Sequence, residues 1–224
     1  MKKILKKALQ RSIPTGFDPI IVASMGRSGS TLVHEALSEG LAAARFGPLS
    51  NLGRKIVKDV AWDLSGKYLA PGVTYKTHAL ASELPRDCEA RVVFVFGSAS
   101  EAALSVLSCH HRYGADWIAE HFAHMRACGS FEELGERDVL RFEEQIDGWL
   151  GIDHVKVLGL RYEALWDNVD ELSCFVGFSV ALPERRPRVS RQNMDATTAK
   201  KFAATYRTLD KKIAALADCI LRSD

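Results

Sequence analysis

Short apolar runs alternate along the chain with longer stretches in which apolar residues recur every three or four positions. The runs have the length and composition of buried parallel strands, whereas the longer spacing is typical of helices that bury one face. The pattern therefore predicts an α/β fold, a three-layer sandwich with a central parallel sheet. The predicted strands cover residues 19–23, 73–77, 91–96 and 155–162.

The longer stretches predict helices between and after these strands. The first helix follows the first strand closely and begins near Leu32. A stretch rich in proline and arginine, 183–191, predicts a loop before the last helix. The apolar positions are Leu32, Val33, Ala36, Leu37 and Leu41 in the first helix, Ile56, Val57, Val60 and Leu64 in the second, Val139, Phe142, Ile146 and Trp149 in the third, and Phe202, Tyr206, Leu209, Ile213, Leu216 and Ile220 in the last.

Composition indicates an ordinary globular chain. With 224 residues, 47% of them hydrophobic and 26% charged, it can bury one core, and no repeat or linker divides it, so we expect a single domain over 1–224. A net charge of +2 is too small to indicate a nucleic-acid partner. Five cysteines without a C-x-x-C pair, and no apolar stretch of membrane-spanning length, predict a cytoplasmic protein with reduced thiols.

Residues 1–17 predict a basic N-terminal helix. Within residues 1–12 five basic side chains alternate with apolar ones at helical spacing, and no acid is present. Such a helix either packs against the domain or makes a peripheral contact with an anionic membrane. The basic residues are Lys2, Lys3, Lys6, Lys7 and Arg11.

A loop of small and polar residues joins the first strand to the first helix. Glycines let a backbone wrap around an anion, and amides at a helix N-terminus point toward it, so the loop predicts phosphate or sulfate binding. A Walker A loop would have lysine directly before the Ser/Thr; here Ser30 takes that place and the cation, Arg27, comes earlier. Small residues between a strand and a helix can also form an ordinary turn. The loop reads Ser24-Met25-Gly26-Arg27-Ser28-Gly29-Ser30-Thr31.

The other predicted strand ends carry further polar residues. In parallel sheets, ligands bind beyond the carboxyl ends of the strands, so these residues are the candidates for a site. They are Lys76-Thr77-His78 after the second strand, Gly97-Ser98-Ala99-Ser100-Glu101 with Ser105 after the third, and Arg161-Tyr162-Glu163-Ala164-Leu165 at the end of the fourth.

In this order, the motifs resemble those of the sulfotransferases that use 3'-phosphoadenosine 5'-phosphosulfate (PAPS). The resemblance covers about residues 19–166 and implies the sulfotransferase type of P-loop-containing nucleotide hydrolase-like fold, with PAPS as co-substrate and no metal. It implies His78 as the general base, with an ordinary pKa near ~6.5 that suits the role at neutral pH. Lys76 and Arg27 would stabilise the charge that develops on the transferring sulfuryl group.

The same resemblance implies the nucleotide contacts. The residues from Gly26 to Thr31 would bind the 5'-phosphosulfate, namely Gly26, Arg27, Ser28, Gly29, Ser30 and Thr31. Ser105 stands where the family has a helical serine for the 3'-phosphate. The family's arginine for that phosphate is replaced by Gly97, and Ser98-x-x-Glu101 forms a capping box instead. Cations from the late loop could compensate: Arg185, Arg186, Arg188 and Arg191, of which we favour Arg186 and Arg188.

A helical insertion, about residues 101–150, is expected to border the pocket of the small-molecule acceptor, with Trp117 and Phe122 beside it. His121 and His124 stand one helical turn apart, but no further ligand falls at a zinc spacing, so we expect no metal site. The sequence leaves the acceptor and the oligomeric state open. Two alternatives also remain: a P-loop transferase or kinase whose nucleotide lacks a 3'-phosphate, and an inactive nucleotide-binding protein.

Overall fold

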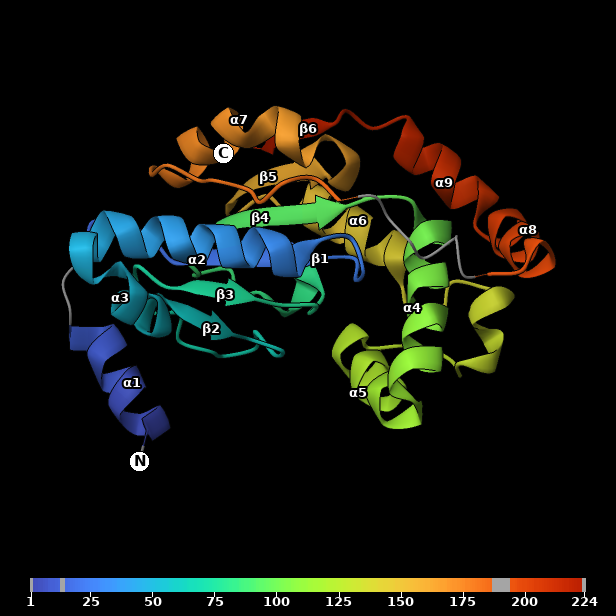
Figure 1. The fold of residues 1–224 in the computed structure, drawn as a ribbon, viewed down its shortest axis with the longest axis horizontal. Helices are drawn as coiled ribbons and strands as arrows, with labels where there is room; N and C mark the ends of the chain where they lie inside the picture. Colours follow the sequence, from blue (N-terminus) through green and yellow to red (C-terminus); the bar gives the residue numbers. More distant parts are fainter. Residues whose placement is uncertain (1, 13–14, 187–193, 223–224) are drawn as a thin grey trace.

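A computed structural model describes residues 2–12, 15–186 and 194–222. Over this part of the chain, six strands form one sheet in the order β2-β3-β1-β4-β5-β6, with β6 alone antiparallel to its neighbour (Figure 1). The α/β fold with a mostly parallel sheet is therefore confirmed. The strands are β1 (Ile20–Ser24), β2 (Lys58–Val60), β3 (Thr74–Lys76), β4 (Arg91–Phe96), β5 (Lys156–Arg161) and β6 (Cys219–Arg222).

Helices cover both faces of the sheet, so the fold has three layers. Alternate residues of β1 and β4 point to opposite faces: Val22 and Val93 join one apolar core, and Ile21 and Phe94 join the other. The first core is covered by α2 (Ser30–Phe46), α3 (Ser50–Val57) and α7 (Val169–Val176). The second is covered by α4 (Ala99–Tyr113), α5 (Ala115–Met125), α6 (Phe142–Gly151), α8 (Ala196–Thr205) and α9 (Arg207–Ala214).

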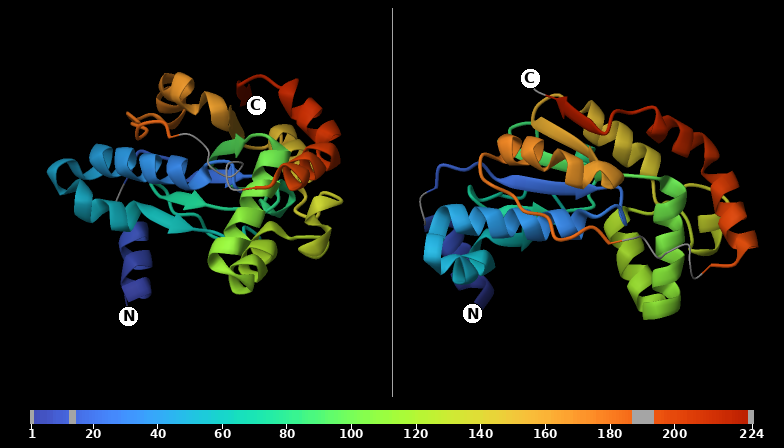
Figure 2. Two further views of the ribbon diagram at one scale, coloured as in Figure 1. Left: turned by 45° about the vertical axis from the view of Figure 1, so that its right-hand side comes forward. Right: turned by 45° about the horizontal axis from the view of Figure 1, so that its top comes forward.

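Shorter elements complete the described chain. The N-terminal helix α1 (Lys2–Ser12) stands off the body of the molecule, while α4 and α5 extend past the sheet at the opposite end (Figure 2). Within the described residues, no helix is both long and apolar enough to cross a bilayer. The 3-10 helices are η1 (Gly47–Leu49), η2 (Ala81–Glu83), η3 (Glu132–Gly135) and η4 (Tyr162–Asn168).

The four predicted strands are all present: β4 has the predicted bounds, and each end of β1, β3 and β5 differs from the prediction by one residue. The helix predicted through Val57 and Val60 is wrong, because α3 ends at Val57 and the chain continues as β2 beside β3. The last helix is also shorter than predicted: it breaks at Tyr206 between α8 and α9, and Ile220 lies in β6. In the third predicted helix, the apolar residue Val139 is buried, but it lies before the start of α6.

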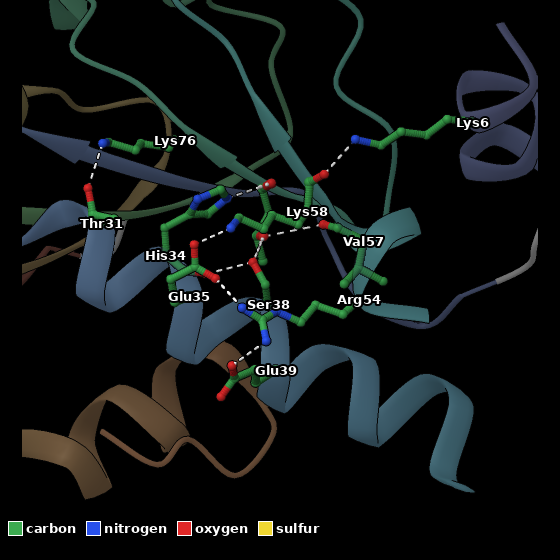
Figure 3. A network of polar contacts seen from close by, with 11 residues as sticks. Lys6, Thr31, His34, Glu35, Ser38, Glu39, Arg54, Val57, Lys58 and Lys76 are labelled. Carbon is green, nitrogen blue, oxygen red and sulfur yellow. Dashed lines mark hydrogen bonds and ion pairs between the residues drawn. The ribbon is translucent and has the colours of Figure 1, made fainter. Parts of the chain in front are cut away.

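A polar seam fastens α2 and α3 to the edge of the sheet (Figure 3). The His34 Nε2 lies 3.1 Å from the Thr74 carbonyl oxygen, which it meets as a donor, and the Ser38 and Thr74 hydroxyls are 2.7 Å apart. Outside them, Glu35 accepts from Arg54 at 2.5 Å and from Lys58. These contacts satisfy the buried polar groups. They also hold α2 at a fixed position over β3. This fixes the distance between the loop before α2 and the residues after β3, which together carry the candidate site.

Candidate functional site

A cavity of about 620 Å³ opens at the carboxyl ends of the parallel strands. Its volume lies within the usual range for small-molecule sites. It is bounded by the loop after β1, the segment after β3, and helices α4 and α5. The lining residues are Arg27, Gly29, Ser30, Thr31 and Leu32, then Trp62, Lys76 and His78, then Ser105, Trp117, Glu120, His121 and His124, and Tyr162.

The loop between β1 and α2 has the backbone of an anion cradle. Gly26, Arg27 and Gly29 have φ angles of 82°, 51° and 95°, in the left-handed region that glycine adopts most readily. Gly29 is the N-cap of α2 and has no side-chain cap among the described contacts, and the first residues of this 17-residue helix line the cavity. A helix start with this loop before it favours binding of an anion.

Two cations from different segments meet at this cradle. Lys76 Nζ donates to Thr31 Oγ1 at 2.7 Å (Figure 3), and Arg27 Nε donates to Ser105 Oγ at 3.0 Å. Burial first, and then the charges of Arg27 and Lys58, lower the pKa of Lys76. The site therefore concentrates positive charge, and a bound anion would relieve the repulsion between these groups.

His78 lies next to Lys76 and is 6% exposed. Its Nδ1 is 3.3 Å from the Ser24 carbonyl oxygen and 3.1 Å from the Ser24 hydroxyl. A carbonyl oxygen can only accept, so Nδ1 carries the hydrogen, and Nε2 has the free electron pair that a base needs. Burial, helped by Lys76, lowers the pKa of His78 well below its ordinary value. The pKa of His78 is thus lower than the near-neutral value expected from the sequence, and the imidazole is in the neutral form that accepts a proton.

Residues that the sequence did not single out support His78. Gln145 Nε2 donates to the His78 carbonyl oxygen at 2.7 Å, and Trp149 Nε1 donates to Gln145 Oε1 at 3.0 Å. Trp149 was predicted only as an apolar residue of its helix. No local pattern marks Gln145 or Ser24 for this role, because their partners lie far away in the sequence.

Two tryptophans and two histidines form an aromatic wall of the cavity. Trp62, which the sequence gave no reason to select, stacks on His124 with ring centroids 4.1 Å apart, and Trp117 stacks on His121 at 4.8 Å. His121 is 7% exposed, and its buried Nε2 has no hydrogen-bond partner among the residues that the structure describes. Burial, followed by the charge of Arg27, lowers its pKa to about 3. This wall offers flat aromatic surfaces and an unsatisfied ring nitrogen to a ligand.

The start of α4, beside that of α2, carries negative charge. The Asp210 Oδ1 of α9 accepts from Ala99 N at 2.6 Å and from Ser98 Oγ at 3.1 Å. At Gly97, a Cβ would lie 3.5 Å from Glu163 Oε2. The amides that could bind a second anion are therefore occupied by a carboxylate, with another carboxylate nearby.

Other predicted site residues take different places. The Ser28 hydroxyl donates to the Val95 carbonyl oxygen at 2.7 Å, so this side chain faces β4 rather than the cavity. Gly26 lies behind the cavity, where its Cβ would meet Met125 Sδ at 2.8 Å. Arg186 is exposed and does not line the cavity, and Arg188 lies outside the described residues. Arg185 lies over the ring of Trp166.

The remaining expectations concern the helical insertion, the start of α4, the end of β5 and a possible metal site. Trp117 lines the cavity, but Phe122 packs against the core, so the expectation for Phe122 is wrong. The Ser98 Oγ accepts from Glu101 N at 3.3 Å, as predicted for a helix cap. Arg161 binds Asp218 at 2.5 Å and thereby ties β5 to the segment before β6. Over 2–12, 15–186 and 194–222, no three His, Cys, Asp or Glu side chains converge on a position for a metal ion.

The cavity as a whole joins an anion cradle, two cations, a neutral imidazole and an aromatic wall. Such a site can hold an anionic group and remove a proton from a group bound next to it. No model of a known protein family matches the chain, and a search of curated proteins gives no significant match either. The functional conclusion therefore rests on the residues of the cavity.

Proposed function

We propose that the protein is a sulfotransferase that moves a sulfuryl group from PAPS to a hydroxyl or amine of a small-molecule acceptor. Its sheet and loop would then be the sulfotransferase type of P-loop fold. One observation carries the proposal: Arg27, Lys76 and His78 line the same cavity at the start of α2, although they come from two separate segments. Cations beside an anion cradle suit a charged donor, and a neutral imidazole suits deprotonation of an acceptor.

In this reaction the acceptor loses a proton to His78 Nε2, and its oxygen or nitrogen attacks sulfur. A bond forms between sulfur and the acceptor while the bond from sulfur to the 5'-phosphate oxygen breaks, and the leaving phosphate takes the electron pair. Lys76 and Arg27 stabilise the negative charge on the sulfuryl oxygens and the leaving group. The amides at the start of α2 hold the 5'-phosphate.

The residues of the cavity fit the two ends of PAPS unequally. The loop at Gly29 and the cation pair suit the 5'-phosphosulfate. The 3'-phosphate has Ser105 on the cavity wall, whereas Asp210 and Glu163 at the start of α4 would repel it. These carboxylates favour a second candidate function, transfer from a nucleotide that lacks a 3'-phosphate.

Calorimetric titration of the protein with adenosine 3',5'-bisphosphate and with adenosine 5'-phosphate separates the two candidates. The leading proposal expects the bisphosphate to bind at least as tightly, and expects purified enzyme to release it from PAPS in the presence of a panel of phenols, alcohols and amines. Preference for the monophosphate would favour the second candidate. Binding of neither nucleotide would overturn both.

His78→Gln tests the base. Loss of a general base lowers turnover by about 10²–10⁴-fold, while nucleotide affinity should remain near that of the wild type. His124→Gln is the matched control, because His124 lines the same cavity and also packs against Trp62. Equal turnover of the two variants, with both shown to be folded by thermal unfolding, would contradict the role of His78.

A further inference from the structure

Helix α1 carries an apolar side that is exposed in the described molecule. At 100° per residue, Ile4, Leu5, Ala8 and Leu9 gather along one side of the helix. All four are exposed: Ile4 by 75%, Leu5 by 63% and Leu9 by 38%, and Ala8 is exposed as well. We call these four residues the apolar side of α1.

The polar side of the same helix faces the protein. Gln10 is 4% exposed and donates to the Ile56 carbonyl oxygen at 2.8 Å. Lys6 donates to the Lys58 carbonyl oxygen at 2.6 Å and lies 3.6 Å from Asp59 Oδ1. A helix that packs onto its own domain normally turns its apolar face inward. In α1 the orientation is reversed, so the helix is anchored by polar contacts and presents its apolar side outward.

The charges beside the apolar side are positive. Residues 1–12 contain no acid, and Lys7 and Arg11 are exposed on α1. Arg11 lies over the Tyr68 ring at 4.9 Å. Burial lowers the pKa of Lys67, and the positive charge of nearby Lys7 adds to this lowering. The acid at the base of the helix, Asp59, is already paired with Lys6. This composition fits an anionic partner.

The shape of the helix favours an extended partner over a second copy of the chain. In Figures 1 and 2, α1 projects from the end of the body at α3. Ile4 and Leu5 on this projecting helix are exposed, so a flat surface can contact them. A symmetric pairing of two α1 helices would bring the same basic residues against each other, with no acid on either helix to offset them. An anionic bilayer offers both an apolar interior for Leu5 and phosphates for Lys7.

We propose that α1 docks the protein on an anionic phospholipid surface, with its apolar side among the acyl chains and its basic residues at the phosphate groups. The proposal concerns the surface of α1 alone and does not depend on the reaction in the cavity. Flotation of the full chain with vesicles tests it. Binding is expected with equimolar phosphatidylserine and phosphatidylcholine, with little binding to phosphatidylcholine alone and release at high salt.

The variant I4E/L5E removes the apolar side without touching a buried residue, and its vesicle binding should fall about tenfold or more. Lys7→Glu should weaken binding to the anionic vesicles only. Leu221→Glu is the matched control, because Leu221 is also 63% exposed but lies on β6, and it should bind as the wild type does.

Four results of the vesicle experiments would overturn the proposal: no binding of the wild type to anionic vesicles, equal binding to phosphatidylcholine vesicles, equal loss in Leu221→Glu, or unchanged binding of I4E/L5E. Light scattering after gel filtration tests the alternative that the apolar side of α1 contacts a second copy of the chain. A dimer that I4E/L5E dissociates would show that the apolar side contacts a second copy instead, and would also contradict lipid docking.

Discussion

The environment of His78 determines which of its nitrogens can act. Ser24 contributes both its carbonyl and its hydroxyl to Nδ1, and Gln145 fixes the backbone behind the ring. The ring is therefore oriented before any ligand arrives, with Nε2 unprotonated. Because Lys76 contributes to lowering the pKa of His78, an anion bound between Lys76 and Arg27 would raise it again and make the imidazole a stronger base when the donor is present.

We predict that His78 stays neutral, with its hydrogen on Nδ1, when the pH falls below 6.5, the ordinary value for histidine. Nitrogen NMR of the imidazole rings measures this directly, and the spectrum of His78→Gln assigns the signal. The pKa should increase on addition of adenosine 3',5'-bisphosphate. Observation of the Nε2–H form, or a titration midpoint at or above 6.5 without ligand, would contradict the arrangement.

Gly29 provides a second test at the level of one residue. An alanine Cβ there would approach Tyr162 Cδ2 to 2.4 Å at a φ of 95°. We expect Gly29→Ala to destabilise the fold by about 1–2 kcal/mol or more and to abolish nucleotide binding, because the cradle must deform. Calorimetry and denaturant unfolding measure the two effects.

Gly47→Ala is the control for Gly29→Ala. Gly47 also has a positive φ, 50°, but a Cβ there meets no atom within 4 Å, and the residue lies at the far end of α2. This variant should lose a similar backbone contribution to stability and keep nucleotide affinity. If both variants bind nucleotide equally, the loop does not form the anion site.

At the scale of the elements, α2 and α4 start side by side but differ in what satisfies their first amides. The start of α2 faces the cavity, whereas α4 is capped by Asp210 from α9. One helix start is thus available to a ligand, and the other is used to attach the C-terminal helices. The start of α2 can therefore accept a negatively charged group of a ligand, whereas Asp210 at the start of α4 would repel one.

We predict that Asp210→Asn increases the affinity for adenosine 3',5'-bisphosphate relative to adenosine 5'-phosphate several-fold, since it removes a carboxylate from the start of α4. The cost in stability should be about 0.3–1 kcal/mol, because an amide oxygen can still accept from Ala99. Asp195→Asn is the control: Asp195 caps α8 by accepting from Thr198 N. An unchanged affinity ratio in Asp210→Asn would indicate that the 3'-phosphate does not approach α4.

The sequence predicted best the strands that are buried on both faces of the sheet, because such strands consist of apolar residues. The strands β1 and β4 are apolar runs. The strand β3 was predicted together with one residue on either side of it. The failure at β2 has a physical cause: this edge strand is three residues long, and Lys58 forms an ion pair with Glu35 rather than entering the core. Val60, which matched the helical spacing, is 43% exposed.

The residues of the candidate site also divide into those that the sequence predicted and those that it did not. Arg27, Lys76 and His78 were accessible to prediction because the ends of adjacent parallel strands meet at one edge of a sheet. Asp210, Gln145 and the wall residue Trp62 were not, because their positions depend on how distant helices and loops pack. The sequence marked the loss of an arginine at Gly97, while the structure adds that a carboxylate from α9 occupies the adjacent amides.

At the scale of the whole molecule, three buried histidines link folding to pH. Burial lowers the pKa of His34 to about 4 and that of His121 to about 3, and it lowers the pKa of His78. For His34, Lys58 and Lys76 add to the lowering, while Glu35 opposes it. These groups bind protons more readily in the unfolded chain, so their contribution to stability is complete above pH 6.5 and is lost as the pH falls.

We predict that the free energy of unfolding decreases steeply between pH 6.5 and about 4. Each such histidine contributes about 1.4 kcal/mol per pH unit within its window. Denaturant unfolding across this range measures the slope. The slope should be shallower in His34→Gln by about the contribution of one group. A free energy that stays constant over the window would contradict the burial of these neutral rings.

The antiparallel strand β6 has a consequence for how the chain reaches its native state. β5 pairs with β4 on one side, but its other edge is covered only when the segment at 219–222 arrives, after α8 and α9. On the ribosome, β5 is therefore synthesised long before its partner and exposes unpaired amides and carbonyls in the meantime. In the folded chain, Arg161 also donates to the Leu216 carbonyl oxygen at 2.5 Å and so holds the segment before β6 beside β5. A chain that lacks the segment at 219–222 would present the open edge of β5 to other chains, where unpaired amides and carbonyls favour aggregation.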